Sequence, residues 1–342
     1  MRNLNPTILK FARSALAGGA IILAVASTAR AEEAKFVMKL ATATINDTQH
    51  EWLKRFAAAV EKDSGGRIKG EIYPASQLGP IPRMIEGVQF GSIQAWIGPP
   101  EFLTGVDERF EALSAPGLFT GQDQMVRVIQ DPAVRDTILA VGANKGLVGL
   151  GLIPIGRSSI VTRKPVRDLA GFKGMKIRVL AAPFQLELIK RMDASPVAMT
   201  LADVLPGLQQ GTIDGSLSTM TIYTTMQFQD AAKYVTETEQ PFLVSIIVMS
   251  KKWFDSLPPD LQKIVHDDAQ KVSVDIVPFV NEFFENQYKI WVSRGGEVIK
   301  LSPADHAALL AKITSIGNDL SKNKPELNKV VQTAFEAAKR NK

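Results

Sequence analysis

The sequence predicts an α/β protein of about two domains, with one long helix lying across both. After a leader of 31 residues, about 311 residues remain, which corresponds to roughly two domains of ordinary size. Short β-rich runs alternate with helical patterns, and repeated strand–helix–strand units favour a mostly parallel sheet with helices on both faces. Residues 260–293 contain no glycine and are helical in composition, which predicts a helix on the order of 50 Å.

The leader has the features of a secretory signal peptide. Residues 1–13 are basic without acids, residues 14–27 are apolar, and Ala29-Arg30-Ala31 supplies the small residues of a cleavage site. The apolar run is too short for a membrane span. We therefore expect residues 1–31 to be removed, so that the exported form begins at Glu32.

Composition excludes several classes of function. The leader carries four of the 40 Lys and Arg residues and none of the 35 Asp and Glu residues, so its removal lowers the net charge from +5 to +1. The high isoelectric point is therefore no sign of nucleic-acid binding. The absence of cysteine excludes disulfides, thiolate catalysis and cysteine-bound metals. We expect a soluble, monomeric periplasmic protein that binds no nucleic acid, cofactor or metal.

The first elements follow from apolar spacing. Helical spacing is clearest in residues 48–63, which Ser64-Gly65-Gly66 ends. Predicted strands span residues 36–42, 67–73, 92–97 and 147–155, and a second helix spans residues 81–90.

The remaining elements continue the same rhythm. Predicted strands span residues 175–179, 212–217 and 242–250, and predicted helices span residues 183–192, 201–210, 303–317 and 325–340. In the long helix of residues 260–293, Pro278 predicts a kink.

No motif of a known catalytic site stands out. His50, His266 and His306 lack the spacing of metal ligands, and no G-x-S-x-G motif is present, although a triad assembled in space remains open. Gly149-Leu150-Gly151 begins like a dinucleotide motif, but Pro154 stands where its third glycine belongs, so we interpret this segment as a buried strand.

The most informative segment is KGMKIRV, residues 173–179. Arg178 lies near the carboxyl end of a predicted strand, on the face opposite Ile177 and Val179. Ligands of α/β proteins bind beyond such strand ends, and a guanidinium suits bidentate binding of a carboxylate. From these residues alone, a surface arginine paired with an acid is the simpler interpretation. Arg157, which follows another strand through Gly156, occupies a comparable position and has the same two interpretations.

Several segments together resemble the periplasmic solute-binding subunit of TRAP (tripartite ATP-independent periplasmic) transporters, the DctP-like family. Each is weak alone, but their order and spacing are specific, and the resemblance runs from about residue 36 to about residue 300. In order they are YPASQLG (73–79), IEGVQFG (85–91), KGMKIRV (173–179), ASPV (194–197) and LADVLPGLQQGTIDG (201–215).

The resemblance implies a set of ligand-binding residues. Arg178 matches the arginine that pairs with the ligand's carboxylate, and Arg157 matches a second, supporting arginine. Ser218 stands where relatives often have asparagine, and Gln240 where a histidine is common. Ala181-Ala182 also replaces the usual Pro-Gly or Pro-Asn, so we expect a small or partly apolar acid as the ligand.

The resemblance further implies a type II-like periplasmic-binding-protein fold, two α/β lobes bridged by the long kinked helix. We expect lobe I in residues 32–154 and 244–283, and lobe II in residues 155–243 and 284–342. The loop Thr44–Asp47 and the segment Ile97–Glu101 are the candidate contacts from lobe I. Glu101 could accept hydrogen bonds from a ligand, although a solvated loop acid is the simpler interpretation.

The function that follows is transport rather than catalysis. We expect the protein to capture a small carboxylate in the cleft between the lobes and deliver it to the small and large membrane subunits of a TRAP transporter. Two alternatives remain. An exported enzyme acting on an organic acid would need an acid–base pair and a nucleophile or metal. A binding protein for an ATP-driven importer or a sensor would differ in its partner.

Overall fold

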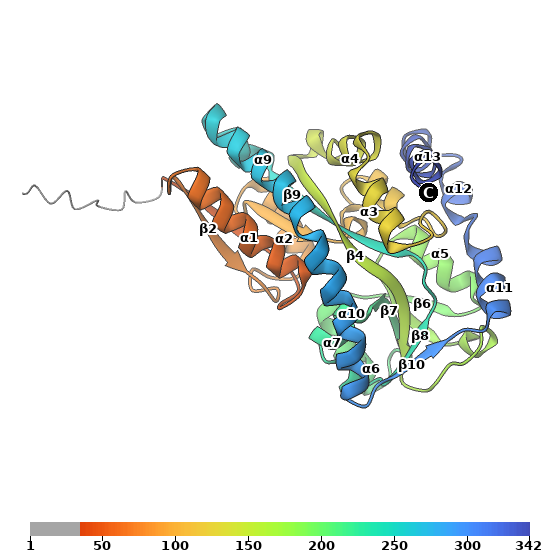
Figure 1. Cartoon of the computed structure of the whole chain (residues 1–342). Coiled ribbons are helices and arrows are strands. Elements are labelled where there is room, and N and C mark those ends of the chain that lie inside the picture. The colour runs from red at the N-terminus through yellow and green to blue at the C-terminus, as the bar shows by residue number, and fades with distance from the viewer. Residues whose placement is uncertain (1–34) are drawn as a thin grey trace, which may run out of the picture. The chain divides into compact units, whose positions relative to one another are not determined.

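The computed structural model describes residues 35–342 (Figure 1), so the predicted signal peptide lies outside the described residues. Within that range, ten strands form one hydrogen-bonded network flanked by helices, which confirms the predicted α/β class. None of the helices in residues 35–342 combines the length and apolar character needed to cross a bilayer.

The N-terminal strands form a parallel unit. Strand β1 (Phe36–Ala41) lies between β2 (Ile68–Tyr73) and β3 (Ala95–Gly98) and runs parallel to both. Helix α1 (Thr48–Asp63) connects β1 to β2, and α2 (Ile81–Phe90) connects β2 to β3, both with the bounds predicted from their apolar spacing.

Two long strands cross the middle of the sheet. Strand β4 (Leu147–Thr162) and strand β9 (Phe242–Ser250) pair antiparallel, and β9 also pairs antiparallel with β3. Strand β4 is longer than predicted because Gly156, with φ of 140°, forms an irregularity in the ladder rather than ending the strand. A Cβ atom at Gly156 would lie 2.5 Å from the Phe284 ring, so this position requires glycine.

The second half of β4 joins a second group of strands. It pairs antiparallel with β7 (Gly215–Thr219) and β8 (Tyr234–Glu237). Strand β5 (Lys176–Val179) runs parallel to β7 and β6 (Ser195–Ala198), and β10 (Glu297–Lys300) runs parallel to β8. The sheet is therefore mixed. Within residues 35–342, five of the nine strand pairings are parallel, in keeping with the predicted strand–helix–strand units. The four antiparallel pairings, which the sequence analysis did not foresee, all involve β4 or β9.

The predicted long helix is two consecutive helices, α9 (Pro259–Asp275) and α10 (Val277–Ser293). The break at Ile276 lies two residues before Pro278, where the kink was expected. Helix α9 packs against α1 and β4, where Trp52 Nε1 donates to Ser273 Oγ at 3.1 Å. Helix α10 continues past β4 to α7 and β10, so the pair runs along both strand groups (Figure 1).

The remaining helices cover the rest of the sheet. Helix α13 packs against α3 and α4, and α12 packs against α5. Their bounds are α3 (Gln122–Gln130), α4 (Pro132–Leu139), α5 (Pro183–Arg191), α6 (Val204–Gln210), α7 (Met220–Thr225), α8 (Lys251–Phe254), α11 (Pro303–Ile313), α12 (Ile316–Ser321) and α13 (Pro325–Arg340). Short 3-10 turns include η1 (Pro100–Leu103) and η2 (Glu108–Ser114).

Candidate ligand-binding site

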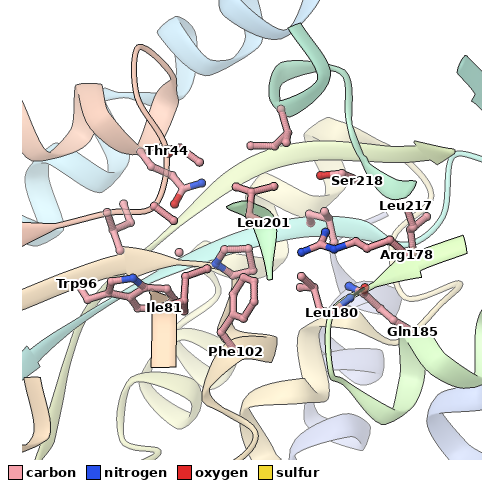
Figure 2. Close-up of a pocket in the computed structure, with 17 residues that line it drawn as sticks. Thr44, Ile81, Trp96, Phe102, Arg178, Leu180, Gln185, Leu201, Leu217 and Ser218 are labelled. Carbon is pink, nitrogen blue, oxygen red and sulfur yellow. Dashed lines mark hydrogen bonds between the residues drawn. The ribbon is translucent and has the colours of Figure 1, made fainter. Parts of the chain in front are cut away.

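A cavity lies between the two strand groups, with β1–β3 and their loops on one side and β5–β7 and their loops on the other. Residues from the end of β3 and the loop after β1 line one side, and residues from the ends of β5 and β7 line the other (Figure 2). These are the carboxyl ends of parallel strands, where α/β proteins bind ligands. Most lining side chains are apolar, namely Ile81, Trp96, Ile97, Phe102, Leu180, Leu201, Leu217, Ile222 and Leu243.

Arg178 is the only charged residue lining the cavity in the part of the chain that the structure describes. Its side chain is 2% exposed, so the interpretation as a surface arginine is wrong. Strand β5 turns Ile177 and Val179 into the core and leaves the guanidinium facing the cavity. Nε donates to the Met199 carbonyl at 3.0 Å, whereas Nη2 has no partner within residues 35–342.

The electrostatics of Arg178 are those of a desolvated cation. Burial lowers the pKa of its guanidinium to about 10, and nearby Tyr223 offsets this lowering only in part. The side chain therefore carries a positive charge at neutral pH. Such a buried charge is costly unless an anion and hydrogen bonds compensate it.

The Tyr223 hydroxyl links strands β4 and β7 beside the cavity. It lies 2.6 Å from the Ser159 carbonyl and accepts a hydrogen bond from the Ser218 backbone N–H at 2.8 Å. Burial raises the pKa of Tyr223, so it stays neutral. Tyr223 thereby positions Ser218, one of the residues expected to bind the ligand, and Ser218 lines the cavity.

The wall opposite Arg178 is aromatic (Figure 2). Trp96 is 1% exposed and meets the Phe102 ring edge-on, with ring centroids 6.4 Å apart. Gly98 leaves space for the indole, since a Cβ atom there would lie 2.3 Å from Trp96 Cζ2. The indole Nε1–H has no hydrogen-bond partner among the described residues.

Besides Ser218, three uncharged polar side chains line the cavity: Thr44, Gln49 and Gln185. Gln185 Oε1 accepts from the Leu180 backbone N–H at 3.1 Å, which fixes the turn that follows β5. Thr44 belongs to the predicted loop Thr44–Asp47, whereas Asp47 faces α1 and caps it by accepting from His50 N at 3.0 Å.

The structure does not bring Arg157 to this cavity. Arg157 Nη2 lies 3.5 Å from Glu237 Oε1, and its guanidinium lies 5.4 Å and 5.3 Å from the ring centroids of Phe284 and Tyr288. It lines a separate depression beside α10. Its position after Gly156 points it toward α10 because the strand continues there instead of turning into the cleft.

Gln240 also lies outside the cavity. Its Oε1 accepts from Gly117 N at 3.0 Å and its Nε2 donates to the Phe119 carbonyl at 3.0 Å. Both ends of this amide are therefore occupied by backbone groups of the segment that precedes α3.

Glu101 is buried rather than solvated, at 2% exposure, and it lies behind the cavity wall instead of lining it. Burial raises its pKa to about 7, with partial compensation from Gln185. Glu111, also buried, accepts a hydrogen bond from the Phe184 N–H in the first turn of α5. Burial and the proximity of Glu101 raise the pKa of Glu111 to about 8.

No group of three or more His, Asp or Glu side chains within residues 35–342 is arranged to hold a metal ion. Trp96, Phe102 and Gln185 are among the lining residues that the sequence analysis missed. For Trp96, the sequence offered one signal: Gly98, two residues later on the same face of the strand, leaves space beside a large side chain.

Residues 41–323 match the family model described as bacterial extracellular solute-binding protein, family 7 (DctP). The chain belongs to this family. The match confirms the resemblance to TRAP solute-binding subunits over most of this family 7 protein.

Relatives of this family 7 protein include characterised binding proteins. The 2,3-diketo-L-gulonate-binding periplasmic protein of Escherichia coli is 28% identical over 226 residues, covering 66% of this chain and 69% of the relative. The C4-dicarboxylate-binding periplasmic protein of Vibrio cholerae is 26% identical over 292 residues, covering 83% and 87%.

Solved structures confirm the predicted fold of the family 7 protein. A sugar acid binding protein from Advenella mimigardefordensis, in complex with galactonate, superposes with a TM-score of 0.84 at 21% identity, covering 90% of this chain and 98% of the other. A TRAP periplasmic solute binding protein from Desulfovibrio salexigens, with bound orotic acid, superposes with a TM-score of 0.83 at 22% identity. The match covers 90% of this chain and 99% of the other.

Proposed function

We propose that the protein is a periplasmic carrier that captures a small organic acid in the Arg178 cavity and delivers it to the membrane subunits of a TRAP transporter. The observation that carries this proposal is Arg178 itself, a buried guanidinium whose Nη2 has no partner within residues 35–342 and which lines a mostly apolar cavity. A carboxylate would neutralise the charge and accept from the unpartnered N–H group. Ser218, which also lines the cavity, would contact the same ligand.

Relatives support the substrate class. The relatives and solved structures named above are described as binding 2,3-diketo-L-gulonate, C4-dicarboxylates, galactonate and orotic acid. All of these ligands are organic acids, and the Arg178 cavity has the chemistry to bind one.

We propose that the two strand groups are two lobes that close on the ligand. Lobe I would comprise residues 32–154 and 244–283, and lobe II residues 155–243 and 284–342. The cavity takes Trp96 and Thr44 from the first set and Arg178 and Ser218 from the second. A ligand that contacts both sets binds the closed form better, which is the condition for ligand-driven closure.

We expect binding without turnover. Because Arg178 is the only charged lining residue within residues 35–342, the cavity offers no acid–base pair from these residues. Mass spectrometry of the ligand after prolonged incubation with the protein checks this. Recovery of unchanged ligand supports a carrier, whereas steady conversion supports the exported-enzyme alternative.

The site is tested by calorimetry with organic acids on Arg178 variants. In Arg178→Ala the ligand's carboxylate would be buried without a positively charged partner. The dissociation constant should therefore rise by two to four powers of ten, or about 3–5 kcal/mol. Arg178→Lys keeps the positive charge but loses the planar guanidinium that can donate two parallel hydrogen bonds. Its affinity for the carboxylate should therefore lie between those of wild type and Arg178→Ala. Arg67→Ala is the matched control, since Arg67 pairs with Asp260 on the surface.

Circular dichroism establishes that each variant is folded. If folded Arg178→Ala binds within about threefold of wild type, Arg178 is not the carboxylate anchor. Arg157→Ala is expected to weaken ligand binding less than Arg178→Ala does, because Arg157 lies outside the cavity. N-terminal sequencing of the periplasmic fraction tests export and cleavage before Glu32.

A further inference from the structure

We propose that the cavity selects a monocarboxylate with an apolar body and one neutral hydrogen-bond acceptor at the end remote from the carboxylate. This rests on the proposed function, because Arg178 is taken as the anchor for the carboxylate. It goes further by assigning what the rest of the ligand must be, and it makes Trp96 a specificity-determining residue.

A single charge argues for a single carboxylate. No second cation lines the cavity within residues 35–342. The other candidate, Arg157, is held elsewhere by Glu237 and by the rings of Phe284 and Tyr288. A second carboxylate on the ligand would therefore be buried without a partner, which is strongly unfavourable.

The apolar lining argues against a polyhydroxylated body. Most of the lining is apolar: Phe102, Leu180, Leu201 and Leu217 stand around the space in front of Arg178 and offer no side-chain hydrogen bonds (Figure 2). The uncharged polar side chains of the lining are confined to Thr44, Gln49, Gln185 and Ser218. Each sugar hydroxyl facing such a wall would lose its hydrogen bonds to water without replacement. An aryl or branched alkyl body gains from leaving water at the same place.

The acceptor is inferred from the wall opposite Arg178. Trp96 is 1% exposed and lines the cavity, yet its Nε1–H is unpartnered among the described residues. Buried donors normally have a partner, and an indole N–H can only donate. Three donors on lining residues are thus unsatisfied within residues 35–342: Arg178 Nη2, Gln185 Nε2 and Trp96 Nε1. Figure 2 draws Gln185 on the same side as Arg178 and Trp96 on the opposite side. The ligand's carboxylate can accept from the first two donors, and an acceptor at its other end satisfies the third.

Calorimetry with four probes tests this proposal. The pair para-methoxyphenylacetate and para-ethylphenylacetate differ only by an ether oxygen in place of a methylene. Succinate supplies a second carboxylate, and galacturonate supplies hydroxyls. We expect the methoxy acid to bind about fivefold more tightly than the ethyl acid, and both to bind at least about a hundredfold more tightly than succinate or galacturonate.

Trp96→Phe removes the N–H while keeping an aromatic ring, so the preference for the methoxy acid should fall to about one. Trp253→Phe, on α8 outside the cavity, is the matched control and should retain the preference. Thermal denaturation checks that both variants fold.

The outcomes separate the two proposals. Tighter binding of succinate or galacturonate, lost in Arg178→Ala, overturns this inference and leaves the carrier function standing. An unchanged methoxy preference in folded Trp96→Phe overturns the role of Trp96. If no carboxylate in a broad panel of organic acids binds the folded protein, the proposed function itself fails.

Discussion

Arg178→Met should stabilise the ligand-free protein while it abolishes ligand binding. Burial lowers the pKa of the guanidinium from 12.5 to about 10, which corresponds to a cost of about 3 kcal/mol for holding the charged form in the fold. Because the lowered pKa remains well above neutral, this cost is present throughout the ordinary pH range. Methionine is unbranched and flexible enough to fill the same space without the charge.

The substitution also removes one favourable contact. Arg178 Nε donates to the Met199 carbonyl, and losing that bond costs about 1 kcal/mol. The expected net gain is therefore about 1–2 kcal/mol.

Urea denaturation at pH 7 without ligand measures this gain, as a higher midpoint with an unchanged slope. Saturating ligand should reverse the order, because only wild type gains stability from binding. A ligand-free Arg178→Met protein less stable than wild type by more than about 1 kcal/mol would refute the reasoning and make Arg178 a structural residue. Arg157→Met, which loses the Glu237 pair, is the contrasting control and should be destabilised.

Two further predictions concern residues near the cavity. Burial raises the pKa of Glu101 from 4.5 to about 7, so its favourable contribution is complete below pH 4.5 and is lost as pH rises through 7. Glu101→Gln should therefore stabilise the protein by up to about 3 kcal/mol at pH 8 and by little at pH 4.5, and equal effects in urea denaturation at both values would contradict this. Gly98→Ala places a Cβ atom 2.3 Å from the Trp96 indole, so we expect about tenfold weaker ligand binding by calorimetry; unchanged affinity would show that the indole adapts.

The sequence predicted those elements whose apolar spacing is unambiguous. Helices α1 and α2 and strand β9 have the predicted bounds because each has a clear period and a clear stop. Strand β4 was predicted too short because a glycine can end a strand or bulge it, and only the partner strand decides which. The crossing of β4 and β9 depends on long-range pairing that no local pattern reports.

The candidate site was predictable only in part. Arg178 could be singled out because a charged residue inside an apolar strand needs an explanation, and its position in the cavity agrees with that reasoning. Trp96 reads from the sequence as an ordinary core residue, since burial and cavity lining leave the same apolar pattern. Arg157 and Gln240 were expected to contact the ligand, but their partners Glu237 and Gly117 are distant in the sequence, so their actual contacts could not be foreseen.

The two long strands have a mechanical consequence. Strands β4 and β9 pass between the strand groups as a paired ladder, with irregularities near Gly149 and Gly156, rather than as loose linkers. Any movement between the two strand groups must bend this paired ladder. The two irregular points are where its hydrogen-bond register is interrupted. If the two groups close on a ligand as proposed, these two points are where we expect the ladder to bend. It also has little chain entropy to lose, so more of the contact energy with a ligand remains available as affinity.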